Sequence, residues 1–335
     1  MRPAEGIQSK AGCLVGTRDL LKRAAVRFPK VGLSRMPSVT LAQMKAVEAL
    51  ARTGKFSRAA EDLGISQPSV STQIQSFEEL CRTRVFIRDG HNVSVAPSAI
   101  DLIAKIRITL KCLSEVDRAI TDTTSLNTGT ISIGFSAHRL IMPILTAFVR
   151  EYPSLRLSTR GGPSLDLADA VLRGELDVAA ISQVAPDNRF SSLRLHESRI
   201  AIYGRKGDPM LAKGRLALAD LDGRDMVLWN KASGTRTLLE DAANKQGVRL
   251  KPVLEVATLD VAYAAAAAGI GLAISIEGEV PPDDHIEVVP LVEPELAIGH
   301  YLVTLPECRD HAAIQAFFDV AKDHALEVGG GLPSA

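Results

Sequence analysis

Residues 56–74 read FSRAAEDLGISQPSVSTQI, a stretch with the features of two short helices joined by a tight turn. Adjacent alanines in its first half permit another helix to pack closely. Gly64 supplies the positive φ that the turn needs. Ser66 is placed to cap the second helix, and Pro68 lies in its first turn, where the missing N–H loses no helical hydrogen bond. The stretch therefore predicts a helix-turn-helix.

The second helix of this motif has one apolar and one polar face. Val70, Ile74 and Phe77 form the stripe expected to be buried, and Ile65 is expected to fill the core just before it. The outward side chains carry hydroxyl and amide groups and no acid. Such groups suit the major groove of DNA because they reach base edges and phosphate oxygens. A plain solvated helix is the alternative, but the complete helix-turn-helix arrangement favours DNA binding.

The flanking segments complete a predicted DNA-binding domain over residues 38–96. Apolar residues at helical spacing predict a helix that begins at Leu41 and stops at Gly54, and Ser57 is expected to cap the next helix. Residues 82–95 predict two short strands around a glycine-containing turn, which would form a basic wing. The residues expected to contact DNA are Ser57, Arg58, Ser66, Gln67, Pro68, Ser69, Ser71, Thr72, Gln73, Arg84 and Arg88.

The same pattern continues beyond the helix-turn-helix through Phe77, Glu78, Val85, Phe86 and Arg88. Together with the stretch quoted above, this set resembles the LysR-type transcriptional regulators. The resemblance extends across most of residues 38–325. It implies a winged helix-turn-helix followed by a periplasmic-binding-protein-like effector domain, in subunits that assemble as dimers and then as a tetramer.

Three positions depart from the pattern of that family. Arg82 stands where a glycine usually ends the helix, and Ala96 and Ala99 stand where a threonine and a glycine usually open the next one. These changes affect caps and turns. They bear on local stability more than on the face that reads DNA.

A long helix is predicted to link the DNA-binding domain to the rest of the chain, over residues 97–126. Its apolar residues form a narrow seam with nearly the coiled-coil repeat. Packing against its own domain is one interpretation, and dimerisation is favoured because a helix this long between two domains has little intrachain surface to cover. The residues of the expected dimer seam are Ile103, Ile106, Leu110, Leu113, Val116 and Ile120, preceded by Ile100.

Residues 127–328 alternate short apolar strands with helices, so the fold class is α/β overall behind a mainly helical N-terminal domain. A first βαβαβ series predicts a parallel sheet with right-handed crossovers. A second βα series occupies roughly residues 190–285, and the last strand and helix return to the first series. We expect two lobes, the first about 127–185 with 295–328 and the second about 186–294, followed by a flexible tail at 329–335.

A small-molecule site is expected between the lobes, because ligands of such sheets bind outside the carboxyl ends of the strands. Ser233, Gly234, Thr235 and Arg236 lie between a strand and a helix, where N–H groups, hydroxyls and a guanidinium suit a carboxylate, phosphonate or phosphate. Ordinary helix capping with a surface arginine is the alternative. From the other lobe the candidates are Ser136, His138, Arg139, Arg160 and Gly161. An arginine that follows a strand lies more often at the surface, but if Arg139 and Arg160 both point inward, the effector would be anionic.

Charge and composition bound the remaining possibilities. The formal net charge is zero. However, residues 1–37 hold eight basic and two acidic residues, and residues 38–96 seven basic and six acidic, which leaves an acidic remainder. The basic start is interpreted as a disordered extension with Met36 as an alternative first residue, or as an arm that binds DNA phosphates. No run of apolar residues is long enough for a membrane span.

Enzymes and receptors are weaker alternatives. No zinc spacing, nucleophile elbow or phosphate-binding loop occurs, so neither a metal nor a cofactor is expected. A solute-binding receptor would explain two lobes and not the helix-turn-helix. Redox sensing through Cys81 and Cys112 is a further alternative, although a buried structural cysteine is the commoner outcome. The expected partners are double-stranded DNA with a two-fold operator, a small effector, further copies of the chain and RNA polymerase, in the cytoplasm.

Overall fold

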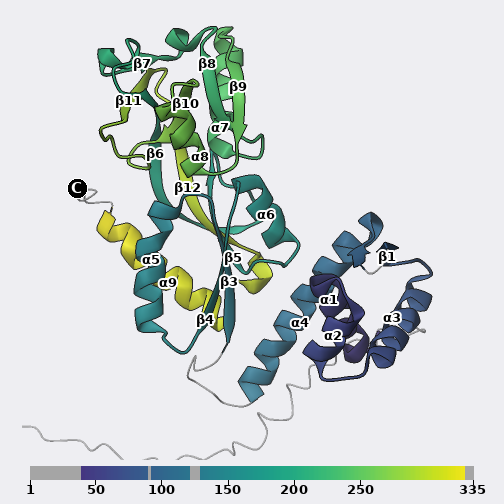
Figure 1. Cartoon of the computed structure of the whole chain (residues 1–335). Helices are drawn as coiled ribbons and strands as arrows, with labels where there is room; N and C mark the ends of the chain where they lie inside the picture. The colour runs from purple at the N-terminus through teal and green to yellow at the C-terminus, as the bar shows by residue number, and fades with distance from the viewer. Residues whose placement is uncertain (1–38, 90–91, 121–128, 329–335) are drawn as a thin grey trace, which may run out of the picture. The chain divides into compact units, whose positions relative to one another are not determined.

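The computed structural model describes residues 39–89, 92–120 and 129–328 (Figure 1). The basic stretch 1–37, the end of the predicted linker and the tail at 329–335 therefore lie outside the described residues. Within the described part, a helical domain (residues 41–99) precedes a long helix and an α/β domain (residues 130–328). The predicted fold class is confirmed.

The helical domain is a helix-turn-helix with a two-stranded wing, as predicted. Gly64 ends the second helix with a φ of 64°. Val70, Ile74 and Phe77 are buried as expected, whereas Ile65 is 43% exposed, because it lies in the turn and does not enter the core. The elements are α1 (Leu41–Thr53), α2 (Phe56–Leu63), α3 (Gln67–Cys81), β1 (Phe86–Asp89) and β2 (Asn92–Val95).

The three departures from the family pattern lie at caps and turns in the structure. Arg82 ends α3 in the left-handed region with a φ of 52°, the one non-glycine residue of the described chain with a positive φ. Ala96 precedes the next helical turn without a side-chain cap, and Ala99 is buried. A glycine at position 82 would adopt this backbone without strain.

The linker consists of a short 3-10 turn, η1 (Pro97–Ala99), and the helix α4 (Ile100–Ile120). Ile103 and Ile106 of the predicted dimer seam are buried in the core of the helical domain together with residues of α1. Leu110 is half-buried against the same core. Leu113 is half-buried and Val116 is exposed, and the side chain of Ile120 lies outside the described set. The first half of the seam therefore packs within its own domain, and among the described side chains of the second half Leu113 is partly open and Val116 fully open to a partner.

The first lobe of the α/β domain has the predicted parallel βαβαβ arrangement, with strand order β4-β3-β5. Its buried side chains form one core with the C-terminal helix α9. The elements are β3 (Thr130–Phe135), α5 (His138–Glu151), β4 (Arg156–Gly161), α6 (Ser164–Leu172), β5 (Val178–Gln183) and α9 (Ala312–Val328), with a 3-10 turn η4 (Pro306–Cys308) before α9.

The second lobe repeats the parallel arrangement with strand order β10-β8-β9. Apolar cores cover both faces of this sheet. The elements are η2 (Leu211–Lys213), β7 (Leu216–Ala217), η3 (Leu218–Leu221), β8 (Asp225–Trp229), α7 (Gly234–Gln246), β9 (Lys251–Val256), α8 (Leu259–Ala267), β10 (Leu272–Ile276) and β11 (Ile286–Glu293).

Two antiparallel strands join the lobes (Figure 1). The 15-residue strand β6 (Ser191–Arg205) pairs along its first half with β12 (Ala297–Thr304), and its second half pairs with β10 and β11. The ladder between β6 and β12 shifts register between His300 and Tyr301. The change of lobe predicted near residue 186 lies further along the chain, because β6 changes partners near Arg199.

Candidate functional sites

The helix α3 begins with a hydroxyl cap. The Ser66 Oγ accepts a hydrogen bond from the Ser69 N–H at 3.3 Å, and the two serine hydroxyls lie 2.7 Å apart. Pro68 occupies the first turn of the helix. The burial of the apolar stripe then leaves the polar side chains of α3 on the outer face, as predicted.

The polar side chains on the outer face of α3 differ in whether they already form hydrogen bonds within the protein. The Thr72 hydroxyl donates to the Pro68 carbonyl at 3.0 Å, so it serves the helix itself. Gln67 is exposed and Gln73 half-buried, and neither side-chain amide has a hydrogen-bond partner among the described residues. These two amides are therefore free to bond a ligand. Ser69 is exposed and Ser71 is half-buried on the same helix.

Three basic side chains of the helical domain lie outside α3. Arg58 and Arg84 are exposed, and neither forms an ion pair within the described part of the chain. The Arg88 guanidinium lies 5.0 Å from the centre of the Phe56 ring, which positions it beside α2. Ser57 lies inside α2 and does not cap it, because α2 begins at Phe56 after Lys55. The predicted cap was therefore wrong, although Ser57 remains exposed.

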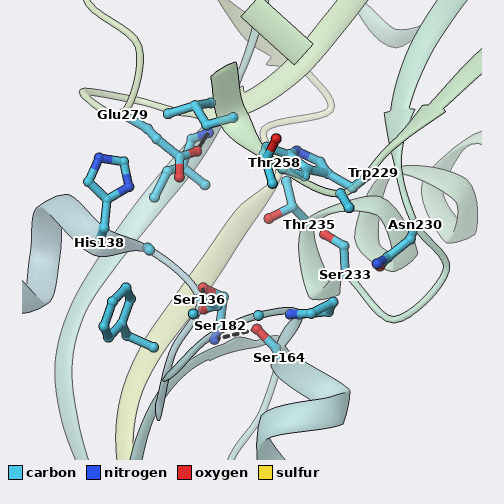
Figure 2. A pocket seen from close by; sticks show the side chains of 18 residues that line it. Ser136, His138, Ser164, Ser182, Trp229, Asn230, Ser233, Thr235, Thr258 and Glu279 are labelled. Atoms are coloured by element: carbon cyan, nitrogen blue, oxygen red, sulfur yellow. Dashed lines mark hydrogen bonds between the residues drawn. The ribbon is translucent and has the colours of Figure 1, made fainter. Parts of the chain in front are cut away.

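The α/β domain contains a cavity of about 320 Å³ between its lobes (Figure 2). The helices α5, α6, α7 and α8 all begin at this cavity, so their N–H-rich ends converge on it. Of the predicted effector residues, five line it, namely Ser136, His138, Gly161, Ser233 and Thr235. Residues that the prediction missed include Ser164, Ser182, Trp229, Asn230, Thr258 and Glu279.

Gly234 contributes to the site through its size. A Cβ at this position would lie 2.4 Å from the carbonyl oxygen of Ser182. Only glycine permits the start of α7 in the second lobe to approach the end of β5 in the first lobe this closely. Ser233 caps α7, because its Oγ accepts from the Arg236 N–H at 3.4 Å.

A chain of polar groups runs from the cavity into the strands that join the lobes. The Ser164 Oγ accepts from the Ser182 N–H at 3.0 Å, which leaves its own proton free to donate. The Ser182 hydroxyl lies 3.3 Å from the Ser136 hydroxyl and 2.9 Å from Nδ1 of His300. His300 Nε2 lies 3.0 Å from the Ser198 hydroxyl of β6. Burial lowers the pKa of His300 to about 4, with a smaller contribution from His196, so the ring is neutral at physiological pH.

Two arginines expected in the cavity are bound outside it. The Arg160 guanidinium pairs with Glu175 at 3.4 Å, and its side chain is exposed. The Arg139 guanidinium donates to the carbonyl oxygens of Gly278 and Glu279, both at 3.2 Å. Because Arg139 lies in the first turn of α5 in the first lobe and Gly278 follows β10 in the second, this contact bridges the lobes. The prediction that these guanidinium groups point into the cleft was wrong.

Arg236 is also turned away from the cavity. It is only 4% exposed and donates to Glu240 at 2.7 Å, to Glu255 at 2.6 Å and to the Trp229 carbonyl at 2.5 Å. Position three of α7 directs the side chain toward the next turn of the helix and the neighbouring strand β9. The guanidinium therefore fastens α7 to the sheet.

The cysteine thiols and the potential metal ligands give little support to redox sensing or to a metal site. Cys81 is half-buried, and burial together with the charge of Glu78 raises its pKa, which disfavours the reactive thiolate. Cys112 is exposed on α4. Among the described residues, no group of three potential ligands is placed to hold a metal ion. In that same part of the chain, no helix combines the length and apolar character of a membrane span.

Comparison with known proteins identifies both parts of the chain. Residues 41–99 match the bacterial regulatory helix-turn-helix protein, lysR family, and residues 124–326 match the LysR substrate binding domain. The chain belongs to the LysR family. This LysR-type transcriptional regulator thus combines a DNA-binding domain with an effector-binding domain. The helix-turn-helix and cavity described above lie inside the two matched regions.

Individual relatives agree with this assignment. The HTH-type transcriptional regulator BbuR of Bordetella bronchiseptica is 28% identical over 237 residues, which cover 70% of this chain and 73% of that protein. A full-length OxyR variant from Pseudomonas aeruginosa has a TM-score of 0.72 at 18% identity, covering 86% of this chain and 96% of that one. ArgP from Mycobacterium tuberculosis has a TM-score of 0.65 at 20% identity, with 86% and 98% covered. These two structures share the fold of this chain.

Proposed function

We propose that this LysR-type regulator responds to a small effector that carries a carboxylate, phosphate or phosphonate group and binds in the cavity between the lobes. The observation that carries the proposal is the convergence of four helix starts and several hydroxyls on one cavity of about 320 Å³. That volume is near the lower end for small-molecule sites. Since no arginine or lysine of the described chain lines it, N–H and hydroxyl donors would hold the anion.

Binding of the effector would favour one arrangement of the lobes. An effector can shift such an equilibrium only by as much as its affinity differs between the two arrangements. The Arg139 contact and the strands β6 and β12 cross between the lobes, so each is sensitive to that arrangement. The proposed output is a change in how a dimer or tetramer binds and bends its operator in the cytoplasm, where RNA polymerase acts. The exposed end of the seam on α4 supports dimerisation.

DNA recognition is proposed to use the outer face of α3. In a two-fold dimer, two such helices would enter successive major grooves one helical turn apart. Gln67 and Gln73 supply unbonded amides, and Arg58, Arg84 and Arg88 supply charge for phosphates. The remaining predicted contacts, from Ser57, Ser66, Pro68, Ser69, Ser71 and Thr72, belong to the same proposal.

The effector site is tested by calorimetry on the full chain with a panel of carboxylates, phosphates and phosphonates. Thr235→Val removes a hydroxyl at the start of α7 with little change of shape. For a hydrogen bond to a charged group, we expect the affinity for the best ligand to fall by about 10- to 100-fold. Arg160→Ala is the control and should bind normally. A loss in Arg160→Ala with normal binding by Thr235→Val would contradict the proposed site.

The DNA-binding face is tested by gel shift on the region upstream of the gene for this protein. Ser69→Ala combined with Gln73→Ala should weaken specific binding by at least about tenfold, because each good base contact contributes about 1–3 kcal/mol and the dimer makes each contact twice. Gln75→Ala, which removes the amide that bonds Glu79 on α3, is the matched control. Equal binding by the double variant and the parent protein would exclude this face.

A further inference from the structure

One carboxylate lies in the wall of the effector cavity. Glu279 follows β10 in the second lobe, is half-buried, and is the single acidic residue among the described residues that line the cavity. In Figure 2 it lies on the side away from the hydroxyls of Ser164 and Ser182. The cavity therefore has a donor-rich side and a side with an acceptor of negative charge.

The carboxylate of Glu279 has little compensation from the protein. Among the described residues, its carboxylate accepts one hydrogen bond, from the Ile276 N–H at 3.4 Å, a long distance. The Arg139 guanidinium donates to the main-chain carbonyl of Glu279 and not to its carboxylate. Within the described part of the chain, Glu279 forms no ion pair, although His138 lines the same cavity.

The surroundings of Glu279 also penalise its charge. Burial raises the pKa of the Glu279 carboxyl, and the attraction of Arg139 offsets only part of this effect. Tyr203 is near enough for the charge of Glu279 to add to the burial that raises the tyrosine pKa. The Tyr203 hydroxyl is buried and has no hydrogen-bond partner among the described residues. A carboxylate in such a place is stabilised when a cation reaches it.

We propose that Glu279 binds a positively charged amine of the effector, so that the effector is an amino acid in the broad sense, a molecule with one carboxylate and one ammonium group. The inference rests on the proposed function, which assigns the anionic group to the hydroxyls and helix starts. A ligand with both charges satisfies both sides of the cavity, whereas a simple carboxylic acid leaves Glu279 without a partner.

The experiment compares matched ligands on the full chain by calorimetry and by the fluorescence of Trp229, which lines the cavity and is the one tryptophan of the sequence. The probes are the standard α-amino acids, β-alanine, γ-aminobutyrate and ε-aminocaproate, each paired with the carboxylic acid that lacks the amine. We expect at least one amino acid to bind at least tenfold more tightly than its partner. The series of chain lengths reports how far apart the two charges bind.

The variant Glu279→Gln keeps the shape of the side chain and removes its charge. It should weaken the binding of that amino acid by at least tenfold, leave the binding of the partner acid no weaker, and so abolish the preference. Glu277→Gln, at an exposed carboxylate two residues earlier, is the matched control and should keep the preference. Thermal unfolding of each variant verifies that it is folded.

The outcomes separate the two proposals. If the partner acids bind as tightly as the amino acids, or if Glu279→Gln keeps the preference, the role of Glu279 is wrong and the anion site stands. Binding of phosphates or phosphonates without binding of any amino acid also overturns the inference alone. If no anion of either panel binds, the proposed function fails together with it.

Discussion

The two domains of this protein differ in how many polar side chains they bury. In the described part of the helical domain, Gln43 is the single buried polar side chain, and the groups expected to meet DNA lie at the surface. The α/β domain buries a charged arginine, a histidine and several hydroxyls, and most of these surround the cavity or the joining strands. The buried polar residues are Ser164, Ser182, Ser198, Arg236, Ser275, His300 and Thr304.

This difference follows from the size of the two ligands. DNA is larger than the helical domain and brings its phosphates to the surface, so in the proposed interface unpaired side chains such as Arg58 and Arg84 would suffice. A small effector must be surrounded, which places donors inside the protein, where each needs a partner when the ligand is absent. We therefore expect substitutions of polar residues to alter the stability of the α/β domain far more than that of the helical domain.

The largest change in the free energy of unfolding is expected from His300. Its pKa of about 4 in the folded domain lies below the ordinary 6.5, so between these pH values the unfolded chain binds a proton that the folded chain does not. The stabilisation is complete above pH 6.5 and is lost as the pH falls toward 4, by about 3 kcal/mol in total. Urea unfolding followed by Trp229 fluorescence should show this loss in the parent protein and lack it in His300→Gln. An equal loss in both would exclude His300 as its source.

A smaller loss is expected at Arg236. Arg236→Leu removes three hydrogen bonds and leaves the Trp229 carbonyl without its donor. Both carboxylate partners are partly exposed, which limits the penalty, so the free energy of unfolding should fall by about 2 kcal/mol. Arg160→Leu removes an exposed pair and should cost less than about 0.5 kcal/mol. Equal losses in the two variants would mean that burial of Arg236 has no energetic importance.

The contrast between the helical domain and the α/β domain also explains which features the sequence could predict. The helix-turn-helix depends on local patterns. Gly64 ends α2, Ser66 caps α3, and the apolar stripe that contains Val70 is buried, all as predicted. The parallel units of both lobes were also predicted from alternating strands and helices. The contacts of Arg139 with carbonyl groups far away in the chain, and of Arg236 with Glu255 on the next strand, leave no local pattern in the sequence. The i,i+4 pair of Arg236 with Glu240 is a local pattern and could have indicated that Arg236 serves the helix.

The cavity residues that were not predicted share a position in the fold. Ser182, Asn230 and Glu279 each follow closely on, or lie at the end of, a strand whose carboxyl end meets the cavity, so the rule for open α/β sheets could have indicated them. The strand β6 shows an alternation of apolar and polar residues in its first half that indicates a strand. Its change of partners between the lobes is set by tertiary pairing and has no local signal.

The smallest expected effect lies at the surface of the helical domain and has the opposite sign. Arg82 holds a φ of 52°, which costs a residue with a Cβ about 1–2 kcal/mol, while glycine loses more chain entropy on folding. Arg82→Gly should therefore stabilise the helical domain by about 0.5–1 kcal/mol, measured as an increase in its melting temperature by circular dichroism. Arg84→Gly, two residues away outside the left-handed region, is the matched control and should not stabilise. A destabilised Arg82→Gly would show that the side chain itself stabilises the end of α3, contrary to the rule that surface side chains of this domain contribute little to its folding.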